Sequence, residues 1–333
     1  MKISKPAYFD DFRCIASSCP DSCCKEWDVE VDESATALYT SLPSPLGDRL
    51  RQVLRVNEDG TGSVEIINGR CPMWREDGLC RIQAELGHDA LCKTCREFPR
   101  LTHDYGDFIE MGLELSCPEA ARIILSSPVL PPVTQEYPGG EAPEYDTQAM
   151  EILLRTRETA RNLILDSSLT VPEALAVLLI YGYQAQGELD GEEAAPPDTA
   201  VLLRQAHDFS SEASMGDIMD FFLNLEILNP AWKTRLEAPA SPAPWQESHR
   251  KLAIYFLDRY WLQAVSDYDL VSRLKFMVLS CLVVRYLGGR VSETAQAYSK
   301  EIENCAENMD ALLDAAYAHP AFTDTKLLGL LLA

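Results

Sequence analysis

Nine of the eleven cysteines lie between residues 14 and 117, where their spacing is typical of metal ligands rather than of disulfides. The total is odd and two of the cysteines are adjacent, and both facts fit metal ligation better than paired bridges. Four thiolates complete either a tetrahedral zinc site or a four-iron cluster. The candidates are Cys14, Cys19, Cys23, Cys24, Cys71, Cys80, Cys92, Cys95 and Cys117.

The pattern of these cysteines favours iron over zinc. Zinc sites usually carry repeated C-x2-C pairs or histidines in ligand register. Here Cys92 and Cys95 form one C-x2-C pair, and His88 and His103 stand outside any ligand spacing. We therefore expect an iron–sulfur cluster, with zinc as the alternative. Our first assignment of the four ligands is Cys23, Cys71, Cys80 and Cys95. Two roles stay open for the metal: it takes part in a reaction, or it only stabilises the fold.

The elements around the cysteines are short. Residues 64–67 predict a strand, residues 32–39 and 46–56 predict short helices, and Gly and Pro interrupt the rest. So irregular a segment needs cross-links, and thiolate–metal bonds would supply them. We assign residues 1–130 to a cysteine-rich metal-binding lobe and the Pro- and Gly-rich residues 131–145 to a linker.

From residue 146 onward the chain reads as helix after helix. Apolar residues recur at helical spacing, and a capping box formed by Thr170 and Glu173 predicts a helix through Tyr183. Further helices are expected over 269–287 and 292–317. Cys281 and Cys305 fall inside these helices and are expected to be buried structural thiols. The predicted fold class is mainly α, with an irregular cysteine-rich N-terminal lobe before an all-helical C-terminal domain, 146–333.

The charge balance limits the partners. Lys and Arg number 29 against 52 Asp and Glu, a formal net charge of −23. Such a field repels nucleic acid and anionic membrane surfaces and attracts partners that carry lysine or arginine. The first residues lack the apolar core of a secretory signal, and the longest apolar run, 276–287, is too short to cross a bilayer. We expect a cytoplasmic protein that binds neither nucleic acid nor membrane.

The cysteine motifs resemble those of the flagellin lysine N-methylase family and, more distantly, a wider group of cysteine-rich zinc- or iron-chelating domains. The motifs are C-x4-C-x3-C-C from Cys14, C-P-M-W from Cys71, G-L-C-R-I-Q around Cys80, T-C-R-E-F-P-R around Cys95 and L-S-C-P-E-A-A-R around Cys117. The resemblance covers residues 8–125. Beyond the linker it rests on residues 254–260.

The resemblance implies a bacterial cytoplasmic enzyme that methylates lysine side chains of flagellin, or of another lysine-bearing protein. It implies S-adenosylmethionine as the methyl donor and a [4Fe-4S] cluster as a second cofactor. The cluster ligands would be drawn from Cys14, Cys19, Cys23, Cys24, Cys71, Cys80 and Cys95, with Cys92 and Cys117 outside this core set.

The residues alone give little sign of a methyl-donor site. The usual strand followed by a Gly-rich turn is missing from the sequence, so a methyltransferase here would not be of the doubly wound type. Tyr255, Asp258 and Tyr260 lie on one helix and offer aromatic faces and an oxygen acceptor to a lysine. Ordinary core packing of this helix, with Asp258 and its neighbour Arg259 in solvent, is the favoured interpretation.

Two arginines beside Cys95 are the candidate cofactor-binding residues. Arg96 and Arg100 would grip a carboxylate such as that of S-adenosylmethionine. They would equally well pair with acidic residues of the fold. Two other classes of function stay open: a non-catalytic metal-binding module for structure or interaction, and a redox or metal-handling protein.

Overall fold

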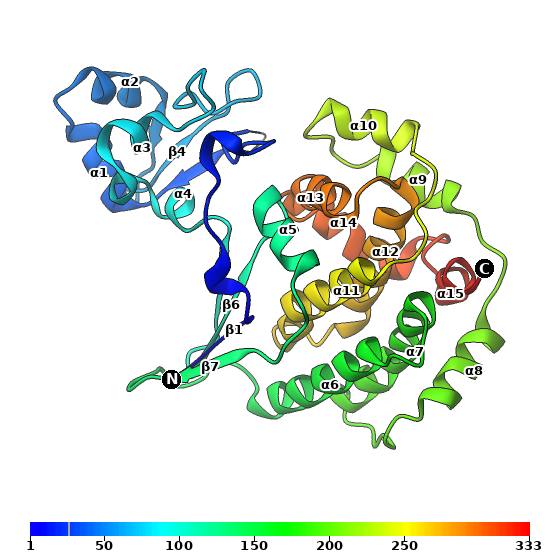
Figure 1. The fold of residues 1–333 in the computed structure, drawn as a ribbon. Coiled ribbons are helices and arrows are strands. Elements are labelled where there is room, and N and C mark those ends of the chain that lie inside the picture. The colour runs from blue at the N-terminus through cyan, green and yellow to red at the C-terminus, as the bar shows by residue number, and fades with distance from the viewer. Residues whose placement is uncertain (26) are drawn as a thin grey trace.

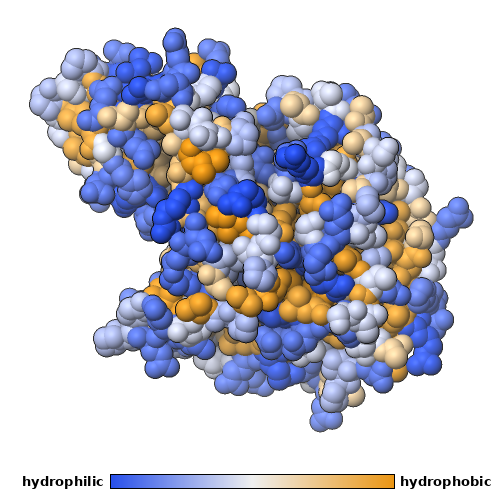
Figure 2. Space-filling model, in the orientation of Figure 1, coloured by the Kyte–Doolittle hydropathy of each residue, from blue (hydrophilic) through white to orange (hydrophobic). Residues whose placement is uncertain are grey.

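The computed structural model describes residues 1–25 and 27–333, and it divides into a small lobe and a larger helical body (Figure 1). Each part has its own hydrophobic core. The core of the small lobe contains Tyr39, Leu50 and Met73. Figure 2, in the same orientation, shows the small lobe projecting from the body with a mostly hydrophilic surface.

The small lobe is built on a three-stranded antiparallel sheet in the order β2-β4-β3. Asp32 ties two of its helices together, because its carboxylate accepts the backbone N–H of Ala35 at 3.1 Å and that of Lys93 at 2.7 Å. Its elements are β2 (Val29–Val31), α1 (Glu33–Ser41), α2 (Pro45–Val53), β3 (Leu54–Val56), β4 (Gly62–Val64), α3 (Arg81–Leu86) and α4 (Lys93–Glu97).

A second sheet, in the order β5-β6-β1-β7, lies along one side of the helical body, below the small lobe in the view of Figure 1. Strand β1 pairs parallel with β6 and antiparallel with β7, so the first residues of the chain are held by segments more than a hundred residues away. Its strands are β1 (Lys2–Lys5), β5 (Arg100–Asp104), β6 (Phe108–Leu113) and β7 (Val133–Glu136).

Part of the segment expected as a linker, 131–145, is therefore a strand. Residues 133–136 form β7 because their backbone groups complete the ladder of β1 and the β-branched Val133 and Thr134 suit extended backbone. The core of the small lobe draws on residues 29–92, whereas Phe9, Phe12 and Leu113 belong to the core of the body. The sequence boundary near residue 130 thus differs from the boundary between the cores.

The body confirms a mainly α fold. Within residues 146–333 every regular element is a helix. One further helix of the body, α5 (Pro118–Ser126), precedes this range. The helices within it are α6 (Thr147–Leu165), α7 (Val171–Leu189), α8 (Thr199–Phe209), α9 (Met215–Leu223), α10 (Pro230–Glu237), α11 (Glu247–Tyr260), the short 3-10 helix η4 (Trp261–Val265), α12 (Leu270–Leu287), α13 (Val291–Ile302), α14 (Ala306–Ala318) and α15 (Asp324–Leu332).

The sequence signals that predicted where helices begin and end are confirmed for α7 and α12. The capping box of Thr170 and Glu173 is present at the start of α7, and α12 ends at Gly288, whose φ of 68° suits glycine. The helix expected over 292–317 is broken into α13 and α14. Asn308 stabilises the break, since its side chain donates to the Glu301 carbonyl at 2.7 Å and the Glu226 carbonyl at 3.0 Å.

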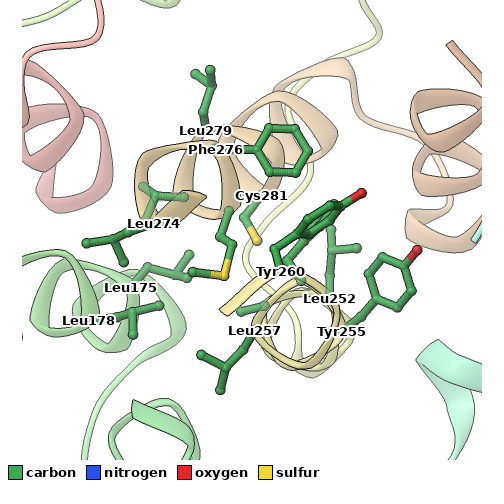
Figure 3. Close-up of a cluster of buried hydrophobic side chains, with 14 of the residues drawn as sticks. Leu175, Leu178, Leu252, Tyr255, Leu257, Tyr260, Leu274, Phe276, Leu279 and Cys281 are labelled. Carbon is green, nitrogen blue, oxygen red and sulfur yellow. The ribbon is translucent and has the colours of Figure 1, made fainter. Parts of the chain in front are cut away.

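The centre of the body is the buried helix α12, which packs against α7 and α11 (Figure 3). Cys281 lies in this apolar cluster with no exposed surface, as expected for a structural thiol. Cys305 is also buried. None of the described helices combines the length and hydropathy that a membrane span requires.

Candidate metal centre and ligand cavity

Six of the nine clustered cysteines converge inside the small lobe. Cys71 follows the sheet, its backbone N–H donates to the Cys24 carbonyl at 2.8 Å, and Cys80 and Cys92 immediately precede α3 and α4. The six thiols are close enough to influence one another's ionisation. They are Cys23, Cys24, Cys71, Cys80, Cys92 and Cys95.

The thiols of this group are electrostatically coupled. A hydrogen bond from Cys24 lowers the pKa of Cys23 to about 7, and a hydrogen bond from Cys95 lowers the pKa of Cys92 to about 7. Burial, followed by the charges of neighbouring thiols, raises the pKa of Cys71 to about 11. Thiols that crowd together in this way are stabilised as thiolates when they bind a metal cation.

A second group stands beside the first. Burial raises the pKa of Cys117 to about 11, and the charges of Cys19 and Cys23 add to the effect. Burial also raises the pKa of Cys19, and the charges of Asp21, Cys14 and Cys23 add to that effect. Cys23 therefore adjoins both groups, and of the three cysteines outside the six, Cys14, Cys19 and Cys117, the last belongs to the core of the body.

The described sulfurs form close pairs but no close group of three. Among residues 1–25 and 27–333, no three cysteine sulfurs lie within 4.8 Å of one another. A tetrahedral zinc ion with bonds of about 2.3 Å would hold its sulfurs about 3.8 Å apart. All four cysteines of our first assignment belong to the six, but which four bind metal remains a prediction.

The segment that carries Cys14, Cys19, Cys23 and Cys24, called the cysteine loop below, is anchored to the body by one buried lysine. Lys300 on α13 lies 2.8 Å from the Asp21 carboxylate, and its ammonium lies 5.1 Å from the centre of the Trp27 ring. Gln296 also donates to Asp21, at 3.0 Å. Burial of Asp21 raises the pKa of its carboxyl, but Lys300, together with hydrogen bonds from the Ser22 backbone and Lys25, more than offsets this, so that the pKa is lowered.

A cavity lies between the second sheet and the helices of the body. About 100 Å³ of it is open to the centres of water molecules, several times what one water needs. Its walls are β1 with the residues that follow it, β5, β6, the end of α5 with residues 127–132, α6 and α11.

The strand register places a row of polar side chains on the sheet face of the cavity. Glu110 on β6 lies opposite His103 on β5 and Ser4 on β1, so the three share one face of the sheet. The Nε2 atom of His103 is buried and has no hydrogen-bond partner among the described residues. Burial, followed by the nearby Arg259, lowers the pKa of His103, which keeps the imidazole neutral at pH 7.

Helix α6 contributes two arginines to the opposite wall. Arg157 binds Glu110 through two hydrogen bonds of 2.6 and 2.7 Å, and Arg161 forms an ion pair with Asp258 on α11. Asp258 keeps 35% of its side chain accessible because it borders the cavity. Burial raises the pKa of Asp258, although Arg161 and Arg157 oppose this.

A buried network on α11 closes the far end of the cavity. Arg259 donates to the Tyr255 hydroxyl at 2.5 Å and lies 3.3 Å from the fully buried carboxylate of Glu303. Tyr260 donates to the same carboxylate at 2.7 Å. Figure 3 shows both tyrosine hydroxyls directed away from the leucines of α7. Each polar group in the network has a partner, as buried polar groups require.

The structure separates the predicted site residues. Tyr255 and Asp258 border the cavity, whereas Tyr260 lies behind it and pairs with Glu303. Arg259, expected in solvent, is buried because Glu303 pairs with it. Whether any of these residues is catalytic stays a prediction.

The two candidate arginines lie elsewhere. Arg96 donates to the Leu91 carbonyl at 3.3 Å, and the Arg100 guanidinium lies 5.2 Å from the centre of the Phe12 ring. Neither borders the cavity. Their role as cofactor ligands also stays a prediction.

The sequence reasoning missed the cavity residues His103, Glu110, Arg157 and Arg161. The two arginines stand four residues apart on a helix otherwise patterned for core packing, and this spacing places both on one face. That was the one signal available. His103 and Glu110 become neighbours only through the register of β5 and β6.

Comparison with known proteins finds three similar chains, each 34% identical over 132 residues, or 38% of this chain. One is the flagellar biosynthetic protein FliU of Salmonella muenchen, of which the match covers 78%. The others are the lysine-N-methylases of Salmonella choleraesuis and Salmonella typhimurium, and the match spans about a third, 33%, of each. No protein-family model and no solved structure matches the chain.

Proposed function

Because this chain belongs to the family of FliU and the flagellin lysine-N-methylases, we propose that it is a protein lysine N-methyltransferase that uses S-adenosylmethionine. The observation that carries the proposal is the match to two chains named lysine-N-methylase. In the reaction a deprotonated lysine nitrogen forms a bond to the methyl carbon as the donor's carbon–sulfur bond breaks, and the donor leaves as a thioether.

We further propose a [4Fe-4S] cluster held by four of the six converging cysteines. The donor set fits, since it consists of thiols alone, and no three of the described sulfurs gather as closely as the ligands of a single tetrahedral ion do. A bound cluster would cross-link a lobe whose own core is small. It would also supply an electron-accepting centre next to the body. Zinc is the alternative metal.

The proposed partner is flagellin or another protein that presents lysines, and the proposed compartment is the cytoplasm. The name of FliU associates that relative with the flagellum. A formal net charge of −23 favours the approach of a lysine-bearing surface.

A non-catalytic metal-binding module is the second candidate. It is favoured by one observation: the matched segment leaves two thirds of each lysine-N-methylase outside the match, yet covers most of FliU. On this alternative the cysteine lobe recognises or stabilises a partner without methyl transfer.

Transfer of a labelled methyl group from S-adenosylmethionine to purified flagellin tests the proposal. We expect label on lysine with the anaerobically purified chain, loss of label with Cys80→Ala, and retention with the matched control Cys305→Ala. A metal-loaded, folded wild-type chain that binds flagellin and transfers no label would instead support the module.

A further inference from the structure

Two features indicate that the cavity between the second sheet and α11 is shaped for a ligand. The first is the buried, unpartnered Nε2 atom of His103, because native proteins seldom leave such an atom without a partner. The second is Gly112 on β6. A Cβ atom added there would meet nothing closer than the Cβ of Leu101 at 4.0 Å, so the missing side chain leaves open space.

The register places Gly112 on the face that carries His103. Gly112 lies opposite Leu101, and Glu110 lies opposite His103, so the four share the sheet face that borders the cavity. The absence of a side chain at Gly112 widens the cavity next to His103. A ligand in this space would reach the His103 nitrogen and the side chains of α11.

The charge of the lining selects the ligand class. Five basic side chains and two carboxylates border the cavity, an excess of three positive charges with His103 neutral. Carboxylates outside the lining offset this excess, because Glu303 pairs with Arg259, Asp10 with Lys5 and Glu158 with Arg161. Within the described residues, Lys251 is the lining cation without a carboxylate partner. The basic residues are Lys5, Arg157, Arg161, Lys251 and Arg259.

The ammonium of Lys251 favours a carboxylate on its side of the cavity. The cavity also retains acceptors for an adjacent amino group, since Glu110 and Asp258 lie on its walls. Tyr8, Tyr255 and aliphatic residues supply the apolar remainder. A carboxylate, an amino group and an apolar body together describe an α-amino acid with a large side chain.

We infer that this cavity binds the amino-acid end of the methyl donor, with Lys251 and Arg259 beside the carboxylate and His103 as a hydrogen-bond partner. The inference rests on the proposed function, and it places the donor on the sheet of the body rather than at Arg96 and Arg100. Lys251 is the available cation of the set: its ammonium donates to the Ser126 carbonyl at 3.0 Å, and no ion pair among the described residues involves it.

Calorimetric titration with S-adenosylhomocysteine tests the inference without any turnover. We expect the wild-type chain to bind it, and Gly112→Leu, which fills the cavity, to weaken binding by about tenfold or more. Gly112→Ala adds only one carbon and should have a smaller effect. Circular dichroism and metal content identify a variant that fails to fold, and the series at one position keeps the test valid if the leucine variant is lost.

A second comparison tests the carboxylate. We expect Lys251→Met to weaken S-adenosylhomocysteine binding by about two- to fivefold and to leave 5′-methylthioadenosine, which has no carboxylate, unaffected. Lys233→Met, on the exposed face of α10, is the matched control. Equal weakening of both ligands overturns the assignment of Lys251.

The possible failures are distinguishable. Wild-type affinity in Gly112→Leu overturns the cavity assignment and leaves the proposed methyltransferase intact, with its donor site elsewhere. If the wild-type chain itself binds no S-adenosylhomocysteine, both the inference and the proposed use of S-adenosylmethionine are wrong.

Discussion

Glu110 on β6 and Arg157 on α6 are joined by two parallel hydrogen bonds of 2.7 and 2.6 Å. The pair fixes the second sheet to helix α6 of the body, and only 18% of the Glu110 side chain and 12% of the Arg157 side chain are exposed. It also holds a carboxylate and a guanidinium on facing walls of the cavity. Bidentate geometry gives this contact both strength and orientation.

Replacing Arg157 with methionine should destabilise the chain by about 3 kcal/mol, because Glu110 would be left buried without its cation. The free energy of unfolding in urea measures the loss. The double variant with Glu110→Gln should recover part of it, since the uncompensated charge is then gone. If the single variant is as stable as wild type, the pair contributes nothing to the fold.

The buried His249 predicts a loss of stability in acid. Burial, with Arg285 nearby, lowers the pKa of His249 from 6.5 to about 4. As pH falls below 6.5 the unfolded chain binds a proton that the folded chain accepts only near pH 4. Stability therefore falls across this window, by about 3 kcal/mol, and is constant above it with respect to this group.

The variant His249→Gln isolates the effect. The difference in unfolding free energy between wild type and variant, measured by urea titration from pH 7 to pH 4, should change by that amount. A difference that does not depend on pH would show that His249 keeps an ordinary pKa in the folded chain.

Local signals predicted the helices well where a few neighbouring residues decide the structure. The capping box of Thr170 and Glu173 and the stop at Gly288 were read from adjacent positions and are present. The break between α13 and α14 was missed because Asn308 stabilises it through Glu226, 82 residues away. The mainly α class was thus predictable, but the points where helices end on distant contacts were not.

The second sheet and its cavity had no comparable signal. Strand β1 has four residues and pairs with β6 and β7, so its structure depends on contacts that sequence periodicity does not encode. The neighbourhood of His103 and Glu110 likewise follows from the register between β5 and β6. The cysteines, in contrast, were recognisable as a set from residue type and spacing, although their division into six and three was not.

The cysteine centre should lose its metal on single substitution. Cys80→Ala removes a thiol of the six, and we expect lower iron content and earlier thermal unfolding of the small lobe, because metal bonds supplement its small core. Iron and sulfide analysis after anaerobic purification measures this. Cys305→Ala is the control, and equal iron in both variants would exclude Cys80 as a ligand.

The Lys300–Asp21 contact should control the order of the cysteine loop. Lys300→Met removes the cation that joins Asp21 to the body and leaves the carboxylate with Lys25 of its own loop. We therefore expect faster proteolysis between residues 13 and 28 and weaker retention of metal. Lys300→Arg should restore part of the protection. Unchanged proteolysis in Lys300→Met would show that the loop is held by the metal centre and its remaining contacts alone.

Mass spectrometry of flagellin produced together with this chain tests the central claim most directly. The account predicts lysine side chains heavier by one methyl group or more with the wild-type chain and with Cys305→Ala, and unmodified lysines with Cys80→Ala. Unmodified flagellin beside a folded, metal-loaded wild-type chain would contradict the assignment as a flagellin lysine methyltransferase.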